Sequence, residues 1–589
     1  MTATRVSLAV TLLLVLATLV GARPGNRRTR RTPDATRVAV KAINGMKVGR
    51  GDWPQWGGWS GRNNTPRGRK IPHEWGEPSR DGYQLGRRDR SGRFQKPQKN
   101  IKWFARLGSV SYGGPVVANG KIFVGTNNAA GYVKRFPDRI DLGCLLCFEE
   151  HTGKFLWQAS SQKLPTGRVH DWSLQGICSS PYVDDDRLWY VTSRGEVVCL
   201  DTEGFHDGRN DGPFQDEPNE HTDEADIVWK FDMMKQLGSR QHNMCNCSVT
   251  SDGKTLFVIT GNGISYNHLT VTAPEAPSFL ALDRDTGQVL WTDNSPGGQI
   301  LHGSWSSPTY AVLGGQPQVL FSGGDGWLYS FDPRGNGQGD SKLLWRFDCN
   351  PKISLWVPGG RGTRNDYVSM AVIYGGLVYI SVGQDPECGT GMGHMWCLDP
   401  TKRGDVSPEL AVDRNGTLIP FAQRRRVQAV DAAAGERAIR NPNSAVVWYY
   451  GQTTFQEYKA TQFERQWHRS MGSVVIKDDL LFAADMSGLL HCVDARTGRG
   501  LWTYDLFGMC WSSPLIVDGK VYVADEDGDM AIFPLTGDRL RALKQVDGEW
   551  APALGEVNMG DSIYTTPIVA NNVLYIAIRS SLFAIRDSD

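Results

Sequence analysis

The chain has 589 residues, of which 40% are hydrophobic, so it can bury a large core and does not belong to the disordered class. Its 64 Lys and Arg nearly cancel its 63 Asp and Glu, so no net charge would recruit nucleic acid or an acidic membrane surface. The 67 Gly, 20 Trp and 18 Tyr are typical of many short strands joined by tight turns. Composition therefore predicts an all-β protein.

Residues 1–22 carry the pattern of a secretory signal peptide. Arg5 precedes an apolar run that ends at Val20, and the small residues Gly21 and Ala22 follow, which suits a signal peptidase. A retained membrane helix is one alternative, although the run is short for a bilayer, and a mitochondrial presequence is another. We expect an exported chain, in the periplasm or outside the cell, with no transmembrane anchor in its mature form.

Two further segments precede the main body of the chain. Residues 23–50 contain nine Lys or Arg together with Pro and Gly, and we interpret them as a flexible basic leader. The first cysteine is Cys144, so the lipid-attachment cysteine of a bacterial lipoprotein is absent. Residues 51–99 form a lead-in that holds three tryptophans in a Gly- and Asn-rich stretch without a strand or helix period: Trp53, Trp56 and Trp59.

Residues 100–589 contain a recurring unit. GLLHCVDARTGRGLW (488–502) matches SFLALDRDTGQVLW (278–291) and LLCFEEHTGKFLW (145–157). In each copy an apolar strand ends in an acidic residue, turns through Thr-Gly and reaches a Trp eight residues after the acid. A strand, a tight turn and another strand lie upstream, as in WSSPLIVDGKVYVADEDGDMAIF (511–533). Each unit therefore holds four antiparallel strands.

Such units predict the blades of a β-propeller, because a four-stranded sheet must bury both faces against neighbours. Eight first strands begin near Pro115, Pro181, Ser248, Pro308, Met370, Ser473, Pro514 and Pro567. The last unit stops before any Trp-bearing strand, whereas residues 100–107 contain one. We therefore expect an eight-bladed propeller whose N-terminal strand completes the last blade and closes the ring, leaving no exposed edge.

These repeats resemble those of the pyrroloquinoline-quinone (PQQ)-like propellers, the quinoprotein alcohol dehydrogenase-like superfamily. GDWPQWGGWSGRNNTP (51–66), followed by NIKWFARLG, is similar to the Trp-rich lead-in of those domains. HMWCLDPTKRGDVSPEL and NPNSAVVWYYG look like exported planctomycete-type members. The resemblance covers roughly residues 50–589. It implies that the three indoles of the lead-in pack on the ring and seal its junction; stacking on a ligand is the alternative.

Stacking the eight units places small residues in one column of the third strand: Cys147, Cys199, Ala281, Ser330, Cys397, Cys492, Ala531 and Ala584. We expect the four cysteines among them to be buried free thiols. Cys178 and Cys245 occupy equivalent positions in adjacent blades, where a disulfide is one possibility. Cys245 and Cys247 alternate onto one strand face and could bind metal with His242, although structural zinc sites usually show two ligand pairs.

Polar and aromatic residues precede the first strand of each blade, at the rim of the central funnel. An aromatic collar is predicted from Tyr112, Trp305, Tyr367, Trp511 and Tyr564. The predicted ligand-binding rim comprises His242, His302, Trp305, Arg364, Tyr367, His468, Arg469 and Trp511. Alternatively, these groups satisfy one another and ordered water. Long loops on the same face favour a ligand: 126–143, 260–278 and 383–394.

The resemblance implies what a dehydrogenase of this superfamily would need: a quinone on a Trp floor, a calcium ion and a carboxylate base. Trp305 or Trp511 would be the floor, Arg364 would meet the quinone oxygens, and the base would be Asp366 or Asp561. The capping pair of adjacent cysteines is missing, and without CxxCH there is no covalent haem.

Two functions are therefore carried forward. The first is a monomeric, exported binding platform whose funnel rim takes a small polar ligand or another exported protein. The second is a PQQ- and calcium-dependent dehydrogenase that oxidises an alcohol or a sugar. We do not expect a nucleic acid as a partner, because the numbers of basic and acidic residues nearly balance.

Overall fold

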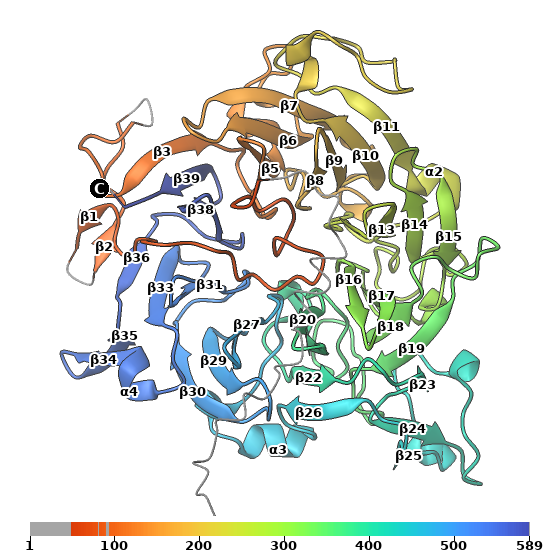
Figure 1. The fold of residues 1–589 in the computed structure, drawn as a ribbon. Coiled ribbons are helices and arrows are strands. Elements are labelled where there is room, and N and C mark those ends of the chain that lie inside the picture. Colours follow the sequence, from red (N-terminus) through yellow and green to blue (C-terminus); the bar gives the residue numbers. More distant parts are fainter. Residues whose placement is uncertain (1–48, 80–81, 90–92, 588–589) are drawn as a thin grey trace, which may run out of the picture.

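The computed structural model describes residues 49–79, 82–89 and 93–587, and they form a ring of radial β-sheets (Figure 1). The expected signal peptide and nearly all of the expected basic leader lie outside the described residues. Within the described part of the chain, no helix is long and apolar enough to cross a membrane.

Eight four-stranded antiparallel blades make up the ring, and the first strand of each lies nearest the centre (Figure 1). Blade one consists of β4 (Val116–Ala118), β5 (Lys121–Asn127), β6 (Leu142–Glu149) and β7 (Phe155–Gln162), and blade two of β8 (Tyr182–Asp184), β9 (Arg187–Val191), β10 (Glu196–Asp201) and β11 (Ile227–Asp232). Blade three consists of β12 (Thr250–Ser251), β13 (Thr255–Ile259), β14 (Phe279–Asp283) and β15 (Val289–Asp293), and blade four of β16 (Thr309–Leu313), β17 (Gln316–Ser322), β18 (Trp327–Phe331) and β19 (Leu343–Asp348).

The other four blades repeat this arrangement. Blade five consists of β20 (Val372–Tyr374), β21 (Leu377–Val382), β22 (His394–Leu398) and β26 (Val446–Tyr450), and blade six of β27 (Val475–Lys477), β28 (Leu480–Ala484), β29 (Leu489–Asp494) and β30 (Gly500–Asp505). Blade seven consists of β31 (Leu515–Val517), β32 (Lys520–Ala524), β33 (Asp529–Pro534) and β36 (Glu556–Asn558), and blade eight of β37 (Ile568–Ala570), β38 (Val573–Ala577), β39 (Ser581–Ile585) and β3 (Ile101–Arg106). Because β3 pairs antiparallel with β39, the N-terminal strand closes the ring. The eight-bladed, all-β prediction is confirmed.

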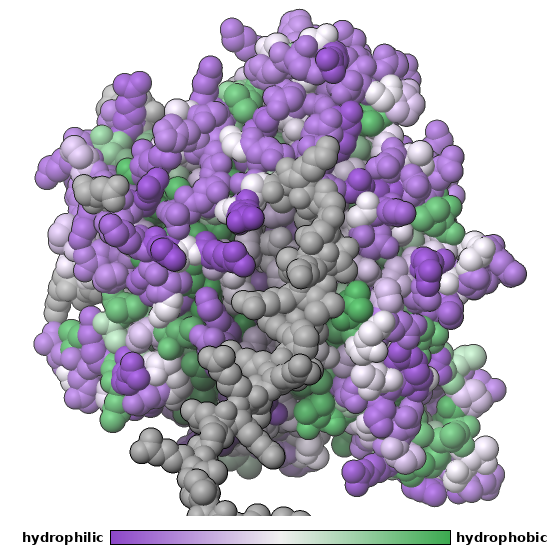
Figure 2. Space-filling model, viewed as in Figure 1, coloured by the Kyte–Doolittle hydropathy of each residue, from purple (hydrophilic) through white to green (hydrophobic). Residues whose placement is uncertain are grey.

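Short strands and helices lie at the outer edges of the blades. They are β1 (Glu77–Pro78), β2 (Tyr83–Gln84), β23 (Gly404–Asp405), β24 (Glu409–Val412), β25 (Arg437–Arg440), β34 (Leu543–Val546), β35 (Glu549–Pro552), α2 (Met233–Leu237), α3 (Phe455–Ala460) and α4 (Arg539–Ala542). On the face shown in Figure 2, hydrophilic residues predominate and hydrophobic ones form small separate groups.

The column of small residues has a direct structural reason, which is the tryptophan on the neighbouring strand. Cys147 pairs with Trp157 across β6 and β7, and a register shift follows immediately. The same pairing joins Cys199 with Trp229, Ala281 with Trp291, Ser330 with Trp345, Cys397 with Trp448, Cys492 with Trp502 and Ala584 with Trp103. A small side chain leaves room for the indole between blades.

The Thr-Gly turn joins each blade to the one before it. In blade six, the Asp494 carboxylate accepts from the Thr497 backbone N–H at 3.0 Å, and Gly498 takes a φ of +72°. A Cβ at Gly498 would lie 2.7 Å from the Trp448 ring of blade five, so only glycine fits under that indole. The Trp448 Nε1–H donates to the Ala495 carbonyl at 2.9 Å. The repeated motif therefore encodes blade-to-blade contact.

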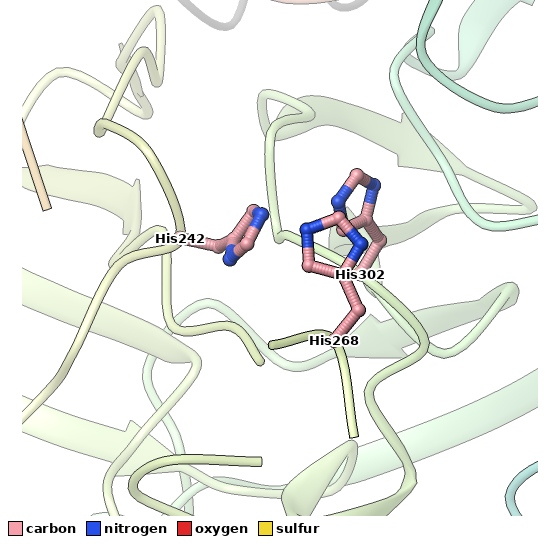
Figure 3. Close-up of side chains that lie close together, drawn as sticks. All are labelled: His242, His268 and His302. Atoms are coloured by element: carbon pink, nitrogen blue, oxygen red, sulfur yellow. The ribbon is translucent and has the colours of Figure 1, made fainter. Parts of the chain in front are cut away.

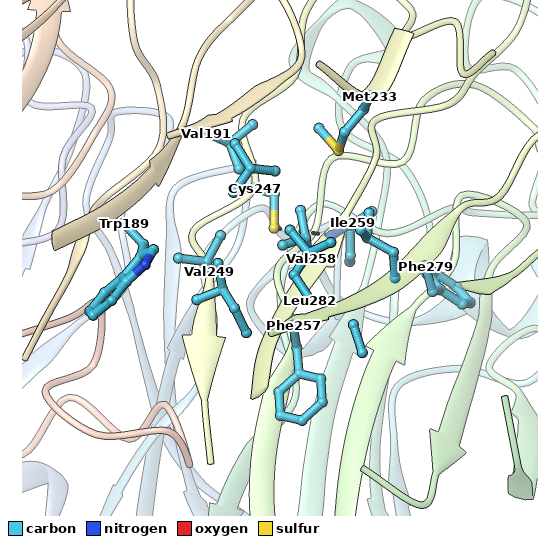
Figure 4. Close-up of a cluster of buried hydrophobic side chains, with 14 of the residues drawn as sticks. Trp189, Val191, Met233, Cys247, Val249, Phe257, Val258, Ile259, Phe279 and Leu282 are labelled. Atoms are coloured by element: carbon cyan, nitrogen blue, oxygen red, sulfur yellow. Dashed lines mark hydrogen bonds between the residues drawn. The ribbon is translucent and has the colours of Figure 1, made fainter. Parts of the chain in front are cut away.

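The core lies between neighbouring blades. Figure 4 shows part of the cluster between blades two and three. Its buried residues include Trp189 of β9, Phe257 of β13, and Val249, which directly precedes β12. Further round, Phe279 stacks on Phe321 of blade four with ring centroids 4.8 Å apart. Each sheet thus buries both faces, as the repeat pattern requires.

The lead-in crosses the middle of the ring (Figure 1) and bonds to all eight blades at the end where first strands turn into second strands. In blade order, its hydrogen-bonded partners are Trp53 with Val117, Pro54 with Val183, Gln55 with Thr250, Ser60 with Tyr310, Gly61 with Ile373, Asn63 with Ile476, Asn64 with Ile516, and Gly51 with Asn571. Residues 51–64, fourteen in all, therefore connect the eight blades to one another, in addition to the closure of the ring by β3.

A buried guanidinium anchors this segment. Arg62 is fully buried with φ of +65°. It donates to the carbonyls of Trp56 at 3.1 Å, Pro308 at 2.9 Å and Ser248 at 2.7 Å, and to Val249 at 3.1 Å. Burial lowers the pKa of Arg62 to about 9. One side chain thus binds the lead-in to blades three and four.

All eleven cysteines are free thiols, so the disulfide considered between Cys178 and Cys245 is not formed. Only Cys178 and Cys388 are partly accessible; the other nine are buried, and burial raises the pKa of Cys247 to about 12. We expect a thiol reagent to modify at most two thiols in the native protein and all eleven after unfolding, counted by absorbance. Rapid modification of more than two native thiols would contradict this packing.

Candidate functional site

One cavity lies at the centre of the ring, on the face opposite the turns that meet the lead-in. Its volume is about 370 Å³, which suits a small organic ligand. Its aromatic lining consists of Trp56, Tyr112, Trp172, Trp305, Trp511 and Tyr564. Asn and Ser side chains, together with Met244, Met370 and Met471, fill the spaces between the rings.

Three of these rings form one continuous wall. Tyr112 stacks on Tyr564 with centroids 5.1 Å apart, and Trp511 lies 4.8 Å from Tyr564 and 5.9 Å from Tyr112. They come from the segments that lead into blades one, seven and eight. Trp56 of the lead-in also lines the cavity, so one indole of the opening Trp-rich stretch is available to a ligand.

Two carboxylates face the cavity, and an arginine outside the lining is paired with one of them. Asp385 and Glu387, from the loop between β21 and β22, both face it, and among the described lining residues none is Lys or Arg. Glu387 accepts from Arg168 at 2.6 Å, and the Arg168 guanidinium lies 3.8 Å from the Trp172 ring centre. This pair is half-exposed, so it contributes less than about 1 kcal/mol to stability.

A cluster of histidines adjoins the cavity (Figure 3). The ring centroids of His242 and His302 lie 4.5 Å apart, and His268 lies 4.9 Å from each. His242 Nδ1 lies 2.9 Å from the Ile264 carbonyl, and His302 Nδ1 lies 2.7 Å from a carboxylate oxygen of Asp385. The cluster and the cavity therefore share Asp385.

The surroundings shift the titration of these groups. Burial lowers the pKa of His242 to about 3. Burial opposes protonation of His302 too, but its hydrogen bond to Asp385 prevails and raises the pKa of His302. Burial also raises the pKa of Asp366 to about 7, and one of its carboxylate oxygens has no hydrogen-bond partner among the described residues.

The predicted rim residues fall into two groups. Trp305 and Trp511 line the cavity, as expected of a collar. His242 and His302 lie beside it, and Trp305 connects them to it: its ring centroid is 4.8 Å from that of His302.

The other predicted rim residues serve the fold. Arg364 is buried and donates to Asp348 at 3.3 Å, and Arg469 donates to Asn365 at 3.0 Å and to four loop carbonyls. His468 Nδ1 lies 2.9 Å from Asp485. The hydrogen bonds of these side chains go to other groups of the protein, and none of the three lines the central cavity.

Tyr367 is misplaced by one residue in the prediction. It is fully buried with its hydroxyl against Cys349, and the next residue, Val368, lines the cavity instead. Successive residues of an extended segment point to opposite sides, so a shift of one residue exchanges core and cavity.

The set that was considered as a possible metal site, Cys245 and Cys247 with His242, is not among the groups that the described structure spaces for a metal ion. Both thiols lie in the apolar cluster between blades two and three, with Cys247 accepting from the Ile259 N–H at 3.3 Å. Within the described ranges, the groups spaced to hold a metal ion are His242 with His268 and His302, and His302 with Asp385 and Cys388.

Sequence reasoning missed His268, Asp385 and Glu387. All three lie in the long loops 260–278 and 383–394, whose lengths already favoured a ligand on this face. Their side chains could have been singled out by asking which ionisable residues those loops carry.

The cofactor that the resemblance implies is PQQ, and the charges of the cavity lining can be compared with those of this molecule. PQQ is a polycarboxylate, yet among the described lining residues two carboxylates and no Lys or Arg face the cavity. Arg364, which would meet the quinone oxygens, lines a different cavity. Asp366 and Asp561, the candidate bases, are absent from the described lining, and Asp561 instead accepts from Ser580 at 3.3 Å. The residues present do not fit PQQ.

The repeats and the closed ring define an eight-bladed β-propeller, and the sequence is similar to quinoprotein alcohol dehydrogenases and to an outer membrane protein assembly factor. A family model described as outer membrane protein assembly factor BamB matches residues 423–559. Quinohemoprotein alcohol dehydrogenase ADH IIB of Pseudomonas putida is 23% identical over 344 residues, which are 54% of this chain and 47% of that protein. The chain thus matches about half the length of this curated relative.

Solved structures give two further similarities. BamB from Moraxella catarrhalis is 14% identical, with 82% of this chain and 97% of that chain covered and a TM-score of 0.44. Quinohemoprotein alcohol dehydrogenase from Comamonas testosteroni is 13% identical, with 93% and 83% covered and a TM-score of 0.43.

Proposed function

We propose that the protein is a binding protein that takes a small organic cation, such as a quaternary ammonium, in its central cavity. The observation that carries this proposal is the combination of an aromatic wall with a lining that holds carboxylates and, among its described residues, neither Lys nor Arg. The face of an aromatic ring is negative and attracts cations, and desolvated contacts of this kind contribute about 2 kcal/mol.

The geometry of the wall supports the proposal. Tyr112, Trp511 and Tyr564 lie within 6 Å of one another by ring centroid, so one methylated ammonium can contact several rings at once. Asp385 holds a pKa below its usual range because its hydrogen bond to His302 outweighs burial, and it therefore stays ionised. An anionic ligand, PQQ included, would find neither Lys nor Arg among the described lining residues.

The first test is a calorimetric titration with choline and with its neutral isostere, in which carbon replaces the ammonium nitrogen. We expect choline to bind at least tenfold more tightly, and Trp511→Ala to weaken it by about tenfold or more. Trp550→Ala is the matched control, because Trp550 lies in the outer hairpin of β34 and β35, under Arg539. Equal binding of the isostere, or unchanged binding by Trp511→Ala, would refute the cation-binding function.

The proposal includes a location outside the cytoplasm. The expected signal peptide supports it, and so does the matched family, whose description names an assembly factor of the outer membrane. The chain would act there as a monomer that delivers or senses its ligand.

A partner protein at the funnel rim is the second candidate function. The exposed apolar residues Leu174, Leu269 and Phe507 are 56%, 64% and 83% exposed, and all lie on loops of the cavity face. Exposed apolar groups of this kind mark interaction surfaces when they gather. Phe507→Ala should leave choline binding unchanged, because Phe507 is outside the cavity lining, whereas it would weaken a partner complex.

A further inference from the structure

We propose that His242, His268 and His302 form a binding site for a divalent transition metal ion, with zinc as the best match, at the mouth of the central cavity. Each ring offers one ligand nitrogen, and the three nitrogens lie within 4.8 Å of one another (Figure 3). This site goes beyond the proposed cation-binding function and does not depend on it.

Two buried nitrogens in the cluster have no hydrogen-bond partner among the residues that the structure describes. They are the Nε2 atoms of His242 and His302, whose side chains are 1% and 5% exposed. Buried polar atoms in folded proteins are nearly always paired, with protein or with water. Two unpartnered imidazole nitrogens that lie beside a third imidazole therefore offer their lone pairs to one shared partner, and a metal ion is a partner that three such nitrogens can hold together.

The opposite nitrogen of each ring is already held in the orientation a metal ligand needs. His242 Nδ1 donates to the Ile264 carbonyl at 2.9 Å, and His302 Nδ1 donates to Asp385 at 2.7 Å. With the proton fixed on Nδ1, the Nε2 lone pair is free to bind metal. Metal-binding histidines commonly donate their second N–H to a backbone carbonyl or a carboxylate.

The third histidine comes from a long loop between β13 and β14. His268 is half-buried in the 260–278 loop with φ of +62°, and left-handed backbone in a residue other than glycine is often retained at functional sites. With zinc–nitrogen bonds of about 2.0 Å, tetrahedral ligands lie about 3.3 Å apart. Small ring rotations, chiefly of His268, would close the present spacing.

The three imidazole ligands restrict which metal ions the site can bind. Three neutral imidazoles suit zinc, copper or nickel rather than calcium or magnesium, which prefer oxygen. Three protein ligands also leave a coordination position for water or a ligand. Trp305, which contacts His302 and lines the cavity, places that position next to the cavity.

The test uses the full-length mature protein after dialysis against a chelator. It is titrated with Co²⁺, whose visible spectrum reports tetrahedral coordination, and then with Zn²⁺ as competitor. We expect one Co²⁺ per chain, displaced by one Zn²⁺. His268→Ala should lower the Zn²⁺ affinity at least tenfold, and Asp385→Asn, which removes the charge that orients His302, by about tenfold.

His151→Ala is the control, because His151 is exposed on a turn of blade one and far from the cluster in the fold. It should bind Zn²⁺ like the parent protein, and thermal unfolding checks that every variant is folded. An octahedral Co²⁺ spectrum, no Zn²⁺ binding, or equal Zn²⁺ affinity in a folded His268→Ala variant would overturn the proposal. Choline and Zn²⁺ are separate probes, so either proposal can fail alone.

Discussion

Arg62→Ala is expected to lower the free energy of unfolding by about 3 kcal/mol or more. The guanidinium is fully buried and satisfies four backbone carbonyls. Each hydrogen bond from a charged group contributes about 1.5–3 kcal/mol, and the carbonyls left behind stay buried and unpaired. The lead-in would also lose its attachment to blades three and four.

Denaturant unfolding followed by tryptophan fluorescence measures this loss. Arg67→Ala is the matched control, since Arg67 belongs to the same lead-in but is exposed, and it should stay within about 0.5 kcal/mol of the parent. Arg62→Lys should recover only part of the stability, because an ammonium cannot reproduce the planar fork. Equal midpoints for Arg62→Ala and Arg67→Ala would mean that the lead-in is not an anchor.

Arg469→Ala is also expected to lower the free energy of unfolding, by about 3 kcal/mol. Its fork donates to Asn365 at 3.0 Å and to the carbonyls of Cys388 at 2.8 Å, Gly360 at 2.9 Å and Gly362 at 2.8 Å. The arginine therefore ties two loops of blade five to blade six. One of these loops carries Asp385 and Glu387.

Thermal or denaturant unfolding reads out the stability, and the choline titration reads out the cavity. Both should be impaired in Arg469→Ala, whereas the exposed Arg465→Ala should change neither. Unchanged stability in Arg469→Ala would contradict the structural role of this arginine.

The fold could be predicted from sequence because its determinants are local. The Asp494-Thr497-Gly498 turn forms from residues close together in the chain, and each turn receives the Trp of the preceding blade. Blade seven departs from the pattern: Glu556 replaces the Trp opposite Ala531. A hairpin of β34 and β35 intervenes, so the spacing could not locate its fourth strand.

The site was less predictable because it depends on where side chains from distant loops meet. Trp305 and Trp511 could be found because they occupy equivalent positions before a first strand, and in their two blades that position lines the cavity. Arg469 occupies a similar place but is fully used by loop carbonyls that no spacing reveals. Asp385 and His268 lie in loops without a repeat, so only the folded chain brings them together.

The most direct measurement of the central claim is the crystal structure of the mature protein grown with tetramethylammonium. The account predicts one ion in the central cavity, in contact with Tyr112, Trp511 and Tyr564 and within reach of Asp385. An empty cavity at saturating tetramethylammonium, or an ion bound only elsewhere, would contradict it.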